Sequence, residues 1–407
     1  MSRIDDLVRE LCPDGVEYKA LGDIGLLVRG NGLQKKDFTD TGVGCIHYGQ
    51  IYTHYRTYAD QTKSYVAPAA AEKLRKAHPG DLVVATTSEN DEDVCKAVAW
   101  LGGDSIAVSG DACVIRHSCD PKYVAYVFQT APFQSQKRQY ITGTKVRRVS
   151  LGDLARIRVP VPPLDVQRAI VEILDTFSKL EAELEAELEA RRKQITYYRD
   201  QFLSTSLSDS YPTVLAALGE LAQFKYGFTG AARDSGDYRY IRITDIGANG
   251  KLSASGAKFI GGSTDVGEYE VRAGDVLMAR IGATHGKTML VEADARAVFA
   301  SYLIRIRLDG AKVLPSYYWH FAQSRMYWDQ VNALVGGGAQ PQFNANVLKA
   351  VRVPVPALAQ QQRAVSTLDH FDALVNDLSI GLPAELAARR KQYEYYRDRL
   401  LAFEEKV

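Results

Sequence analysis

The chain of 407 residues is long enough for about two or three domains of ordinary size. Its 46% of hydrophobic and 24% of charged residues exclude a wholly disordered chain, and its formal net charge of +1 excludes a strong electrostatic field over the whole molecule. Any anionic partner must therefore be held by local clusters of basic side chains.

The cysteines predict neither a disulfide framework nor a four-ligand zinc site, because their number is odd and no two form a C-x-x-C pair. They are Cys12, Cys45, Cys95, Cys113 and Cys119. The segment from Met1 to Cys12 has no apolar stretch like that of a signal peptide, and no run of about 18 uncharged apolar residues occurs anywhere. We therefore expect a cytoplasmic protein without a membrane anchor.

After a short N-terminal helix, residues 17–157 mix β-branched and aromatic runs with glycine-rich turns and helical patches. Residues 81–85 are typical of a buried strand, and residues 121–129 are typical of a helix. This mixture predicts an α+β domain with an irregular sheet.

A long helix follows the proline-rich turn at 160–163, since proline is tolerated at the start of a helix. From Val166 to Leu203 apolar side chains recur every three or four residues, which predicts a helix about 57 Å long at 1.5 Å per residue. Its apolar stripe needs a partner.

The whole arrangement is repeated once. The segment Arg158-Val-Pro-Val-Pro162 returns 194 residues later as Arg352-Val-Pro-Val-Pro356, and Tyr197-Tyr-Arg-Asp200 returns 198 residues later as Tyr395-Tyr-Arg-Asp398. The second helical copy, from Gln361 to Phe403, is thus four residues longer, and Gly381-Leu-Pro383 predicts a break in it. The simplest partner of the first helix is the second helix, in an antiparallel coiled coil.

The repeat predicts four regions. These are 1–157, an N-terminal helix with the first globular domain; 158–210, the first helical spacer; 211–351, the second globular domain; and 352–407, the second spacer. The predicted fold is α+β, with two tandem domains each followed by a long helix, and the helices pair with pseudo-twofold symmetry.

Several strings carry a resemblance to a known family. They are Arg3-Ile-Asp-Asp-Leu7, Leu11-Cys-Pro-Asp-Gly-Val-Glu17, Ile46-His-Tyr-Gly-Gln-Ile-Tyr-Thr53, Thr86-Thr-Ser-Glu-Asn-Asp-Glu-Asp93, Gly143-Thr-Lys-Val-Arg-Arg148, the two R-V-P-V-P turns and the two R-R-K-Q…Y-Y-R-D helices. In this tandem order, over essentially the whole chain, they resemble the DNA specificity subunit of type I restriction-modification systems.

The resemblance implies that each globular part is a target recognition domain reading one half-site of a bipartite double-stranded DNA. Two adenine-N6 methyltransferase subunits would bind this chain, and motor-nuclease subunits would join for restriction. S-adenosylmethionine, ATP and Mg would be bound by those partners, and no cofactor by this chain. Half-sites about 34 Å apart require a spacer of similar length, and in this family spacer length is expected to set the gap.

Candidate DNA contacts in the first domain surround its most basic window. Residues 135–158 contain Lys137, Arg138, Lys145, Arg147, Arg148, Arg156 and Arg158 against one acid, Asp153. Such side chains grip phosphates, whereas amides and arginines read base edges. The candidates are Tyr48, Gln50, Thr86, Thr87, Ser88, Asn90, Thr144, Lys145, Arg147 and Arg148. An ordinary basic surface loop is the alternative.

In the second domain, residues 336–344 replace these basic residues with amides, which favours base readout over phosphate grip. Residues 280–288 add a flexible, basic, hydroxyl-rich loop. The candidates are Tyr240, Arg242, Arg280, Thr284, His285, Lys287, Gln340, Gln342 and Asn344. A purely structural role is the alternative for each of them.

Repetition and resemblance also suggest partner-subunit contacts on the helices. The candidates are Arg191, Arg192, Tyr197, Tyr198, Arg389, Arg390, Tyr395 and Tyr396. Helix–helix packing and i,i+4 pairs are the alternative.

Catalytic signatures fail on spacing. Gly282 to Thr288 is one residue short of a phosphate-binding loop, Asp14 and Glu17 are too close in sequence for a nuclease metal site, and the [DN]-P-P-[FYW] loop of amino-methyltransferases is absent. We therefore expect a chain without an active site. Two other classes stay open: a self-sufficient DNA-modifying or cleaving enzyme, and a bivalent protein scaffold without a DNA role.

Overall fold

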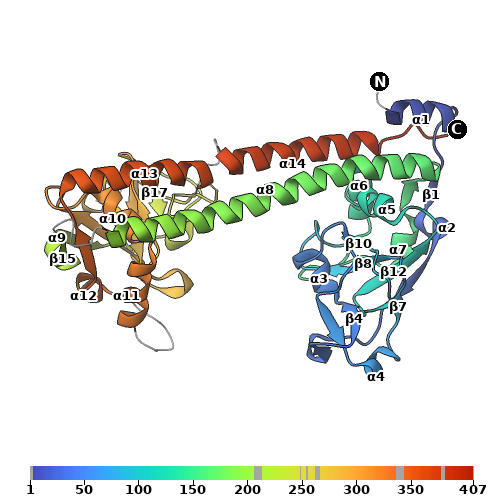
Figure 1. Ribbon diagram of the computed structural model, residues 1–407, viewed down its shortest axis with the longest axis horizontal. Helices are drawn as coiled ribbons and strands as arrows, with labels where there is room; N and C mark the ends of the chain where they lie inside the picture. Colours follow the sequence, from blue (N-terminus) through green and yellow to red (C-terminus); the bar gives the residue numbers. More distant parts are fainter. Residues whose placement is uncertain are drawn as a thin grey trace. The chain divides into compact units, whose positions relative to one another are not determined.

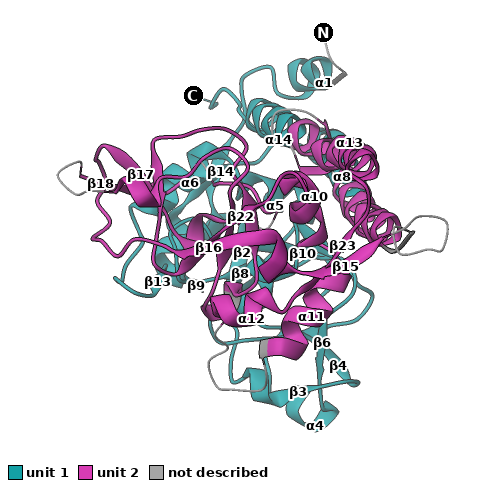
Figure 2. Ribbon diagram, turned by 90° about the vertical axis from the view of Figure 1, so that its left-hand side faces the viewer, with its two compact units in different colours: residues 1–183, 387–407 teal, residues 184–386 magenta. Residues whose placement is uncertain are grey.

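The computed structural model describes residues 3–205, 213–247, 249–253, 255–261, 266–335, 343–376 and 381–406. The chain forms two compact units (Figures 1 and 2). Unit 1 comprises residues 1–183 and 387–407, and unit 2 comprises residues 184–386. Each unit therefore combines a globular part with segments of the long helices.

Unit 1 is built on two five-stranded mixed sheets. The first contains, in spatial order, β2 (Gly25–Arg29), β12 (Ala112–His117), β8 (Leu82–Ala85), β10 (Ala97–Trp100) and β5 (Tyr58–Ala59). The second contains β3 (Phe38–Thr39), β6 (Ser64–Val66), β4 (Val43–Ile46), β11 (Ile106–Val108) and β7 (Lys76–Ala77). Two further pairs join β1 (Tyr18–Ala20) to β14 (Arg158–Pro160) and β9 (Thr87–Ser88) to β13 (Arg147–Arg148).

The helices of unit 1 are short, apart from the long ones. They are α1 (Arg3–Leu11), α2 (Leu21–Ile24), α3 (Tyr48–Thr53), α4 (Pro68–Ala71), α5 (Pro121–Val127), α6 (Ala131–Arg138) and α7 (Leu151–Arg156), with the turn η1 (Lys35–Asp37). Proline at the first positions of α5 and α6 suits a helix start, because its missing N–H would have no partner there.

Unit 2 repeats this plan with fewer strands. Its sheets are β16 (Ala222–Tyr226), β22 (Leu303–Leu308), β19 (Val276–Ala279) and β20 (Thr288–Leu290); β18 (Phe259–Ile260), β17 (Tyr238–Ile241) and β21 (Ala297–Phe299); and the pair β15 (Val214–Ala217) with β23 (Arg352–Val355). Its short helices and turns are α9 (Leu218–Leu221), η2 (Ile243–Asp245), η3 (Gly267–Tyr269), η4 (Gly282–Thr284), α10 (Pro315–Phe321), α11 (Arg325–Val335) and α12 (Ala345–Lys349).

One central strand in each unit is buried on both faces. In β8, Leu82 and Val84 belong to one apolar cluster, while Val83 and Ala85 belong to another on the opposite face. In β19 the side chains alternate between two clusters in the same way. Alternation between two cores explains why both strands are uninterrupted apolar runs.

The first long helix is α8 (Leu164–Thr205), with 42 residues. The second copy is not continuous. Helix α13 (Leu358–Asn376) ends before α14 (Gly381–Leu400) begins, which confirms the expected interruption near Gly381. Gly381 has φ +75, and a Cβ atom there would lie 2.4 Å from the carbonyl oxygen of Leu374, so glycine is required.

Each unit contains the same helix–helix contact. In unit 1 the rings of Phe177 and Tyr396 stack with centroids 5.5 Å apart, and in unit 2 those of Phe371 and Tyr198 stack at 5.8 Å. Phe371 is the repeat of Phe177, and Tyr396 is the repeat of Tyr198. Among the residues that the structure describes, no helix has the length and apolar character needed to cross a membrane.

A buried glutamine ties each globular part to its helix. Gln361 in α13 donates from Nε2 to the carbonyl oxygens of Pro356 (2.8 Å) and Lys312 (3.0 Å), and its Oε1 accepts from the Leu314 N–H at 2.8 Å. Its repeat, Gln167, makes the matching bonds to Pro162 and Asp120 in unit 1. Both side chains are buried, so these bonds satisfy backbone groups away from water.

We predict that Gln361→Leu lowers the free energy of unfolding by about 2–3 kcal/mol, since it leaves buried backbone groups without partners. Denaturant unfolding of the full chain would measure the loss. Gln362→Leu, at an exposed neighbouring position of α13, is the matched control and should change little. Equal stabilities for the two variants would contradict this role.

Candidate nucleic-acid interface

Two predicted segments of the first domain lie side by side in unit 1. Strand β9 pairs with β13, so that Arg147 is opposite Ser88 and Arg148 is opposite Thr87. The turn between Thr142 and Arg148 is closed by two backbone hydrogen bonds of 2.9 Å. At Gly143, φ is +91 and a Cβ atom would lie 2.1 Å from the Val146 carbonyl oxygen, so this tight turn depends on glycine.

Most of the basic window is engaged inside unit 1. Lys137 is buried and donates to the carbonyl oxygens of Glu92 (3.1 Å) and Val94 (3.0 Å), and its burial lowers its pKa. Arg156 pairs with Asp153 at 3.3 Å, and Arg158 pairs with Glu405 at 2.5 Å.

Besides Arg138 on α6, two basic residues of the window, both in the turn between Thr142 and Arg148, stay open to solvent. Lys145 and Arg148 are exposed and have no side-chain partner in the part of the chain that the structure describes. Thr144 beside them is also exposed. Arg147 is half-buried and pairs with Asp91 at 2.7 Å, so a phosphate would compete with this carboxylate for its guanidinium.

The other candidates of the first domain have internal partners. Thr86, Thr87 and Ser88 are buried, with the hydroxyls of the first two donating to Asp111. Asn90 is exposed and bonds Asp93.

Two of these candidates lie on α3. Gln50 donates to the Ser64 hydroxyl (2.7 Å) and accepts from the His47 N–H (3.0 Å). The half-buried Tyr48 ring packs on His47 at 4.5 Å. These contacts fix the side chains of Gln50 and Tyr48 within unit 1.

In unit 2, two candidates are also held internally. Tyr240 is buried, its hydroxyl donates to the Phe228 carbonyl oxygen at 2.8 Å, and burial raises its pKa. Arg242 makes a bidentate ion pair with the buried Asp245, at 2.8 and 3.2 Å. Both side chains shape the strand end at β17.

The loop after β19 is less engaged. The guanidinium of Arg280 lies 5.2 Å from the centroid of the Tyr226 ring. The Arg280 Nε and the Thr284 hydroxyl are buried without a hydrogen-bond partner in the described part of the chain. Lys287 is half-buried, also without a side-chain partner there, while His285 Nδ1 lies 3.0 Å from the Gly282 carbonyl oxygen.

Gln340 and Gln342 lie outside the described residues. Asn344 caps α12, with its side-chain oxygen accepting the N–H groups of Asn346 and Val347 at 3.0 Å. Capping fixes this side chain at the helix start.

The sequence did not identify four residues that lie at strand ends, two in each unit. In unit 2, Tyr226 and Tyr302 are exposed by 42% and 53% beside Arg280. In unit 1, Arg29 and Asp111 occupy the corresponding places and lie 3.9 Å apart. No motif marks these residues, since the two copies differ here in every side chain.

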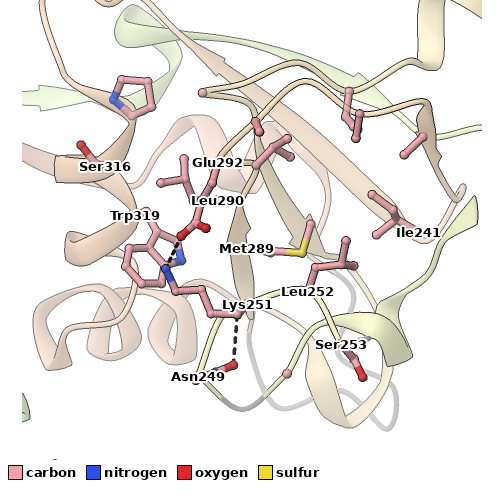
Figure 3. A pocket seen from close by; sticks show the side chains of 18 of the residues that line it. Ile241, Asn249, Lys251, Leu252, Ser253, Met289, Leu290, Glu292, Ser316 and Trp319 are labelled. Carbon is pink, nitrogen blue, oxygen red and sulfur yellow. Dashed lines mark hydrogen bonds and ion pairs between the residues drawn. The ribbon is translucent and has the colours of Figure 1, made fainter. Parts of the chain in front are cut away.

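A cavity of about 1340 Å³ lies in unit 2, and some of the polar groups that line it pair with one another (Figure 3). Lys251 forms an ion pair with Glu292, and its ammonium group lies 4.7 Å from the centroid of the Trp319 ring. Asn249 accepts the Lys251 N–H at 3.1 Å. The Trp319 Nε1 and the Nε of Arg239, another lining residue, are buried without a hydrogen-bond partner in the described part of the chain.

The partner-contact candidates divide into two sets. Tyr198 and Tyr396 stack within the chain, and Arg390 pairs with Glu181 at 2.7 Å, as the packing alternative predicts. Tyr197 and Tyr395 are exposed by 58% and 59%. Each of these tyrosines accepts a hydrogen bond from the residue four positions later, Gln201 or Arg399.

The three arginines that remain in this set lie on exposed stretches of α8 and α14. Arg191 lies 3.4 Å from Glu187 and Arg389 lies 3.3 Å from Gln392, whereas the side chain of Arg192 has no partner among the described residues. Exposed side chains with partners one turn away are typical of a solvated helix face.

Comparison with known proteins gives one consistent result. The family model for the type I restriction modification DNA specificity domain matches twice, at residues 13–190 and 215–388. The specificity subunit of the Escherichia coli type I restriction enzyme EcoR124I/EcoR124II is 30% identical over 341 residues, covering 77% of this chain and 79% of that one.

Two solved structures share the fold. The S subunit of the type I restriction-modification system of M. genitalium matches with a TM-score of 0.51 at 13% identity, covering 95% of this chain and 96% of that one. A chain from a study of complex assembly and conformational transition of the type I R-M system matches with a TM-score of 0.58 at 16% identity, covering 95% and 97%.

We predict that the double variant Lys145→Gln, Arg148→Gln weakens binding to duplex DNA. It should also reduce the magnitude of the slope of log affinity against log salt concentration by about two, because binding releases about one counterion fewer for each phosphate contact that is lost. Titrations at several salt concentrations would measure the slope. Arg156→Gln, whose charge is already paired, is the matched control. An unchanged slope in the double variant would place the DNA elsewhere.

Proposed function

This chain belongs to the type I restriction-modification DNA specificity family, and we propose that its two units read the two half-sites of one bipartite DNA target. One observation carries the proposal. The units repeat the same strand order around β8 and β19 and the same ring-stacking contact, while the residues at their strand ends differ. A shared scaffold with different surfaces suits two different half-sites.

The helices would join the two readers. We propose that α8 pairs with α13 and α14 as an antiparallel coiled coil with pseudo-twofold symmetry. The Phe177–Tyr396 and Tyr198–Phe371 contacts, which are copies of each other, support this pairing. In this arrangement 1–157 and 211–351 are the target recognition domains, and 158–210 and 352–407 are the spacers.

The chain would act without chemistry of its own, as a DNA-reading scaffold in the cytoplasm. Methyltransferase subunits would bind the exposed helix faces around Tyr197 and Tyr395 and modify adenine at N6, drawing the base into their own pocket. S-adenosylmethionine, ATP and Mg would be held by these and by motor-nuclease subunits. In this chain's described residues, no group of three or more potential metal ligands occurs.

We predict that co-expression with its methyltransferase, in a host free of DNA methylation, yields N6-methyladenine in one bipartite motif with a fixed gap. Single-molecule sequencing would map the motif. Either subunit alone should give none. Methylation of that motif without this chain would contradict the specificity role, and modification by this chain alone would favour the self-sufficient enzyme.

We also predict that inserting four residues, about one helical turn, into the 182–190 stretch of α8 changes the gap and leaves both half-sites unchanged. The added turn moves one reader along and around the duplex. A same-length variant with glutamate replaced by glutamine there is the control. A changed half-site would contradict the division into readers and spacers.

A further inference from the structure

In each unit, three neighbouring strands have an end at the same edge of the sheet. They are β2, β12 and β8 in unit 1 and β16, β22 and β19 in unit 2. In unit 1 the Thr86 N–H donates to the Asp111 carbonyl oxygen at 2.9 Å, and in unit 2 the Arg280 N–H donates to the Tyr302 carbonyl oxygen at 3.0 Å. The next bond also repeats. The Thr86 carbonyl oxygen accepts from Val149, and that of Arg280 accepts from Phe343.

Strand pairing completes the correspondence. Arg29, at the end of β2, is opposite Cys113, and Tyr226, at the end of β16, is opposite Ile304. These partners lie two residues after Asp111 and Tyr302, respectively. Tyr226, Arg280 and Tyr302, which we name the strand-end corner of unit 2, are therefore the structural counterparts of Arg29, Thr86 and Asp111.

The corner of unit 2 holds an arginine whose side chain has no hydrogen-bond partner among the described residues. The arginines of strand β22 do have partners there: Arg307 makes a bidentate ion pair with Asp275 at 2.8 and 2.9 Å, and Arg305 donates to two backbone carbonyl oxygens. Arg280 instead donates no side-chain hydrogen bond within the described residues, and its Nε is buried without a partner. The terminal nitrogens of Arg280 are not among the buried unpaired atoms, so they remain available to donate to a ligand.

Neighbouring side chains hold this arginine in place. Its guanidinium lies on the Tyr226 ring, and the Tyr226 hydroxyl accepts the Ala345 N–H at 3.0 Å, which anchors the ring to the start of α12. Stacking on an aromatic ring leaves the planar edge of the guanidinium free to make paired hydrogen bonds. Tyr302, whose side chain is exposed, is joined to Arg280 by the backbone hydrogen bond described above.

From this geometry we infer that Arg280, positioned by Tyr226, reads a guanine in the half-site bound by unit 2. The inference rests on the proposed function and adds the residue and the base. Guanine is the base whose major-groove edge presents two acceptors, O6 and N7, that match the forked donors of arginine. The counterpart corner in unit 1, with Thr86 buried and Arg29 beside Asp111, offers different donors, so the two half-sites differ at the corresponding position.

The test uses the complex of this chain with its methyltransferase. Arg280→Gln should lower the preference for G·C at one position of a single half-site by about tenfold or more, and leave the other half-site and the gap unchanged. Arg296→Gln is the matched control, because Arg296 also lies over a tyrosine ring, that of Tyr238 at 4.9 Å, at the start of β21 and away from the corner. Methylated motifs mapped by sequencing give the selectivity at every position.

The role of Tyr226 has its own readout. Tyr226→Leu should reduce selectivity at the same position as Arg280→Gln, and Tyr226→Phe, which keeps the ring, should restore it. A role in folding alone would lower methylation at all positions together and leave the relative selectivity of that position unchanged, which would contradict positioning.

A measurement on the unaltered complex guards against a variant that does not fold. Duplexes with 7-deazaguanine at each guanine of the target remove the N7 acceptor one base at a time. If Arg280→Gln identifies a guanine, weaker binding of the duplex modified at that guanine supports the inference. If Arg280→Gln is inactive, weaker binding of a duplex modified at one guanine of a half-site supports it. Insensitivity at every guanine, or two half-sites without a G·C pair, would overturn it. A wild-type complex without a bipartite motif would instead contradict the proposed function.

Discussion

The burial of one strand on both faces is the constraint on which each unit depends. Strands β8 and β19 lie between two apolar clusters, so their side chains can be only apolar and the chain meets polar surroundings where each strand ends. The next residues, Thr86 and Arg280, begin loops that carry several of the candidate contacts of each unit. The core therefore positions these loops, and their side chains can vary without changing the core.

The duplication, the long first helix and the buried strands could be predicted because each leaves a local signal: a repeated string, a 3.6-residue period or an uninterrupted apolar run. Strands β2 and β16 left no such signal. Their sequences share no motif, and each is fixed by pairing with β12 or β22, more than 70 residues away in the chain. Arg29 and Tyr226 were missed for that reason.

A stretch rich in lysine and arginine can be found in the sequence, but the groups that these side chains pair with in the fold cannot. Arg158 is neutralised by Glu405, 247 residues away, and Lys137 is buried against the carbonyl oxygens of a loop that begins at residue 89. Only the folded chain distinguishes these from Lys145 and Arg148, which face solvent.

The duplicated chain treats its two surfaces differently, and the difference follows from what each must bind. At the strand ends, Arg29, Thr86 and Asp111 in one copy correspond to Tyr226, Arg280 and Tyr302 in the other, so the side chains differ at all three positions. On the helices the copies agree, since Tyr197 with Gln201 in one corresponds to Tyr395 with Arg399 in the other. A partner that recognises the helix face of one copy meets nearly the same face on the second, so one kind of subunit can bind twice. Under the proposed function, each DNA half-site would meet a different corner, so the target would be asymmetric even though the chain that reads it is built from a repeat.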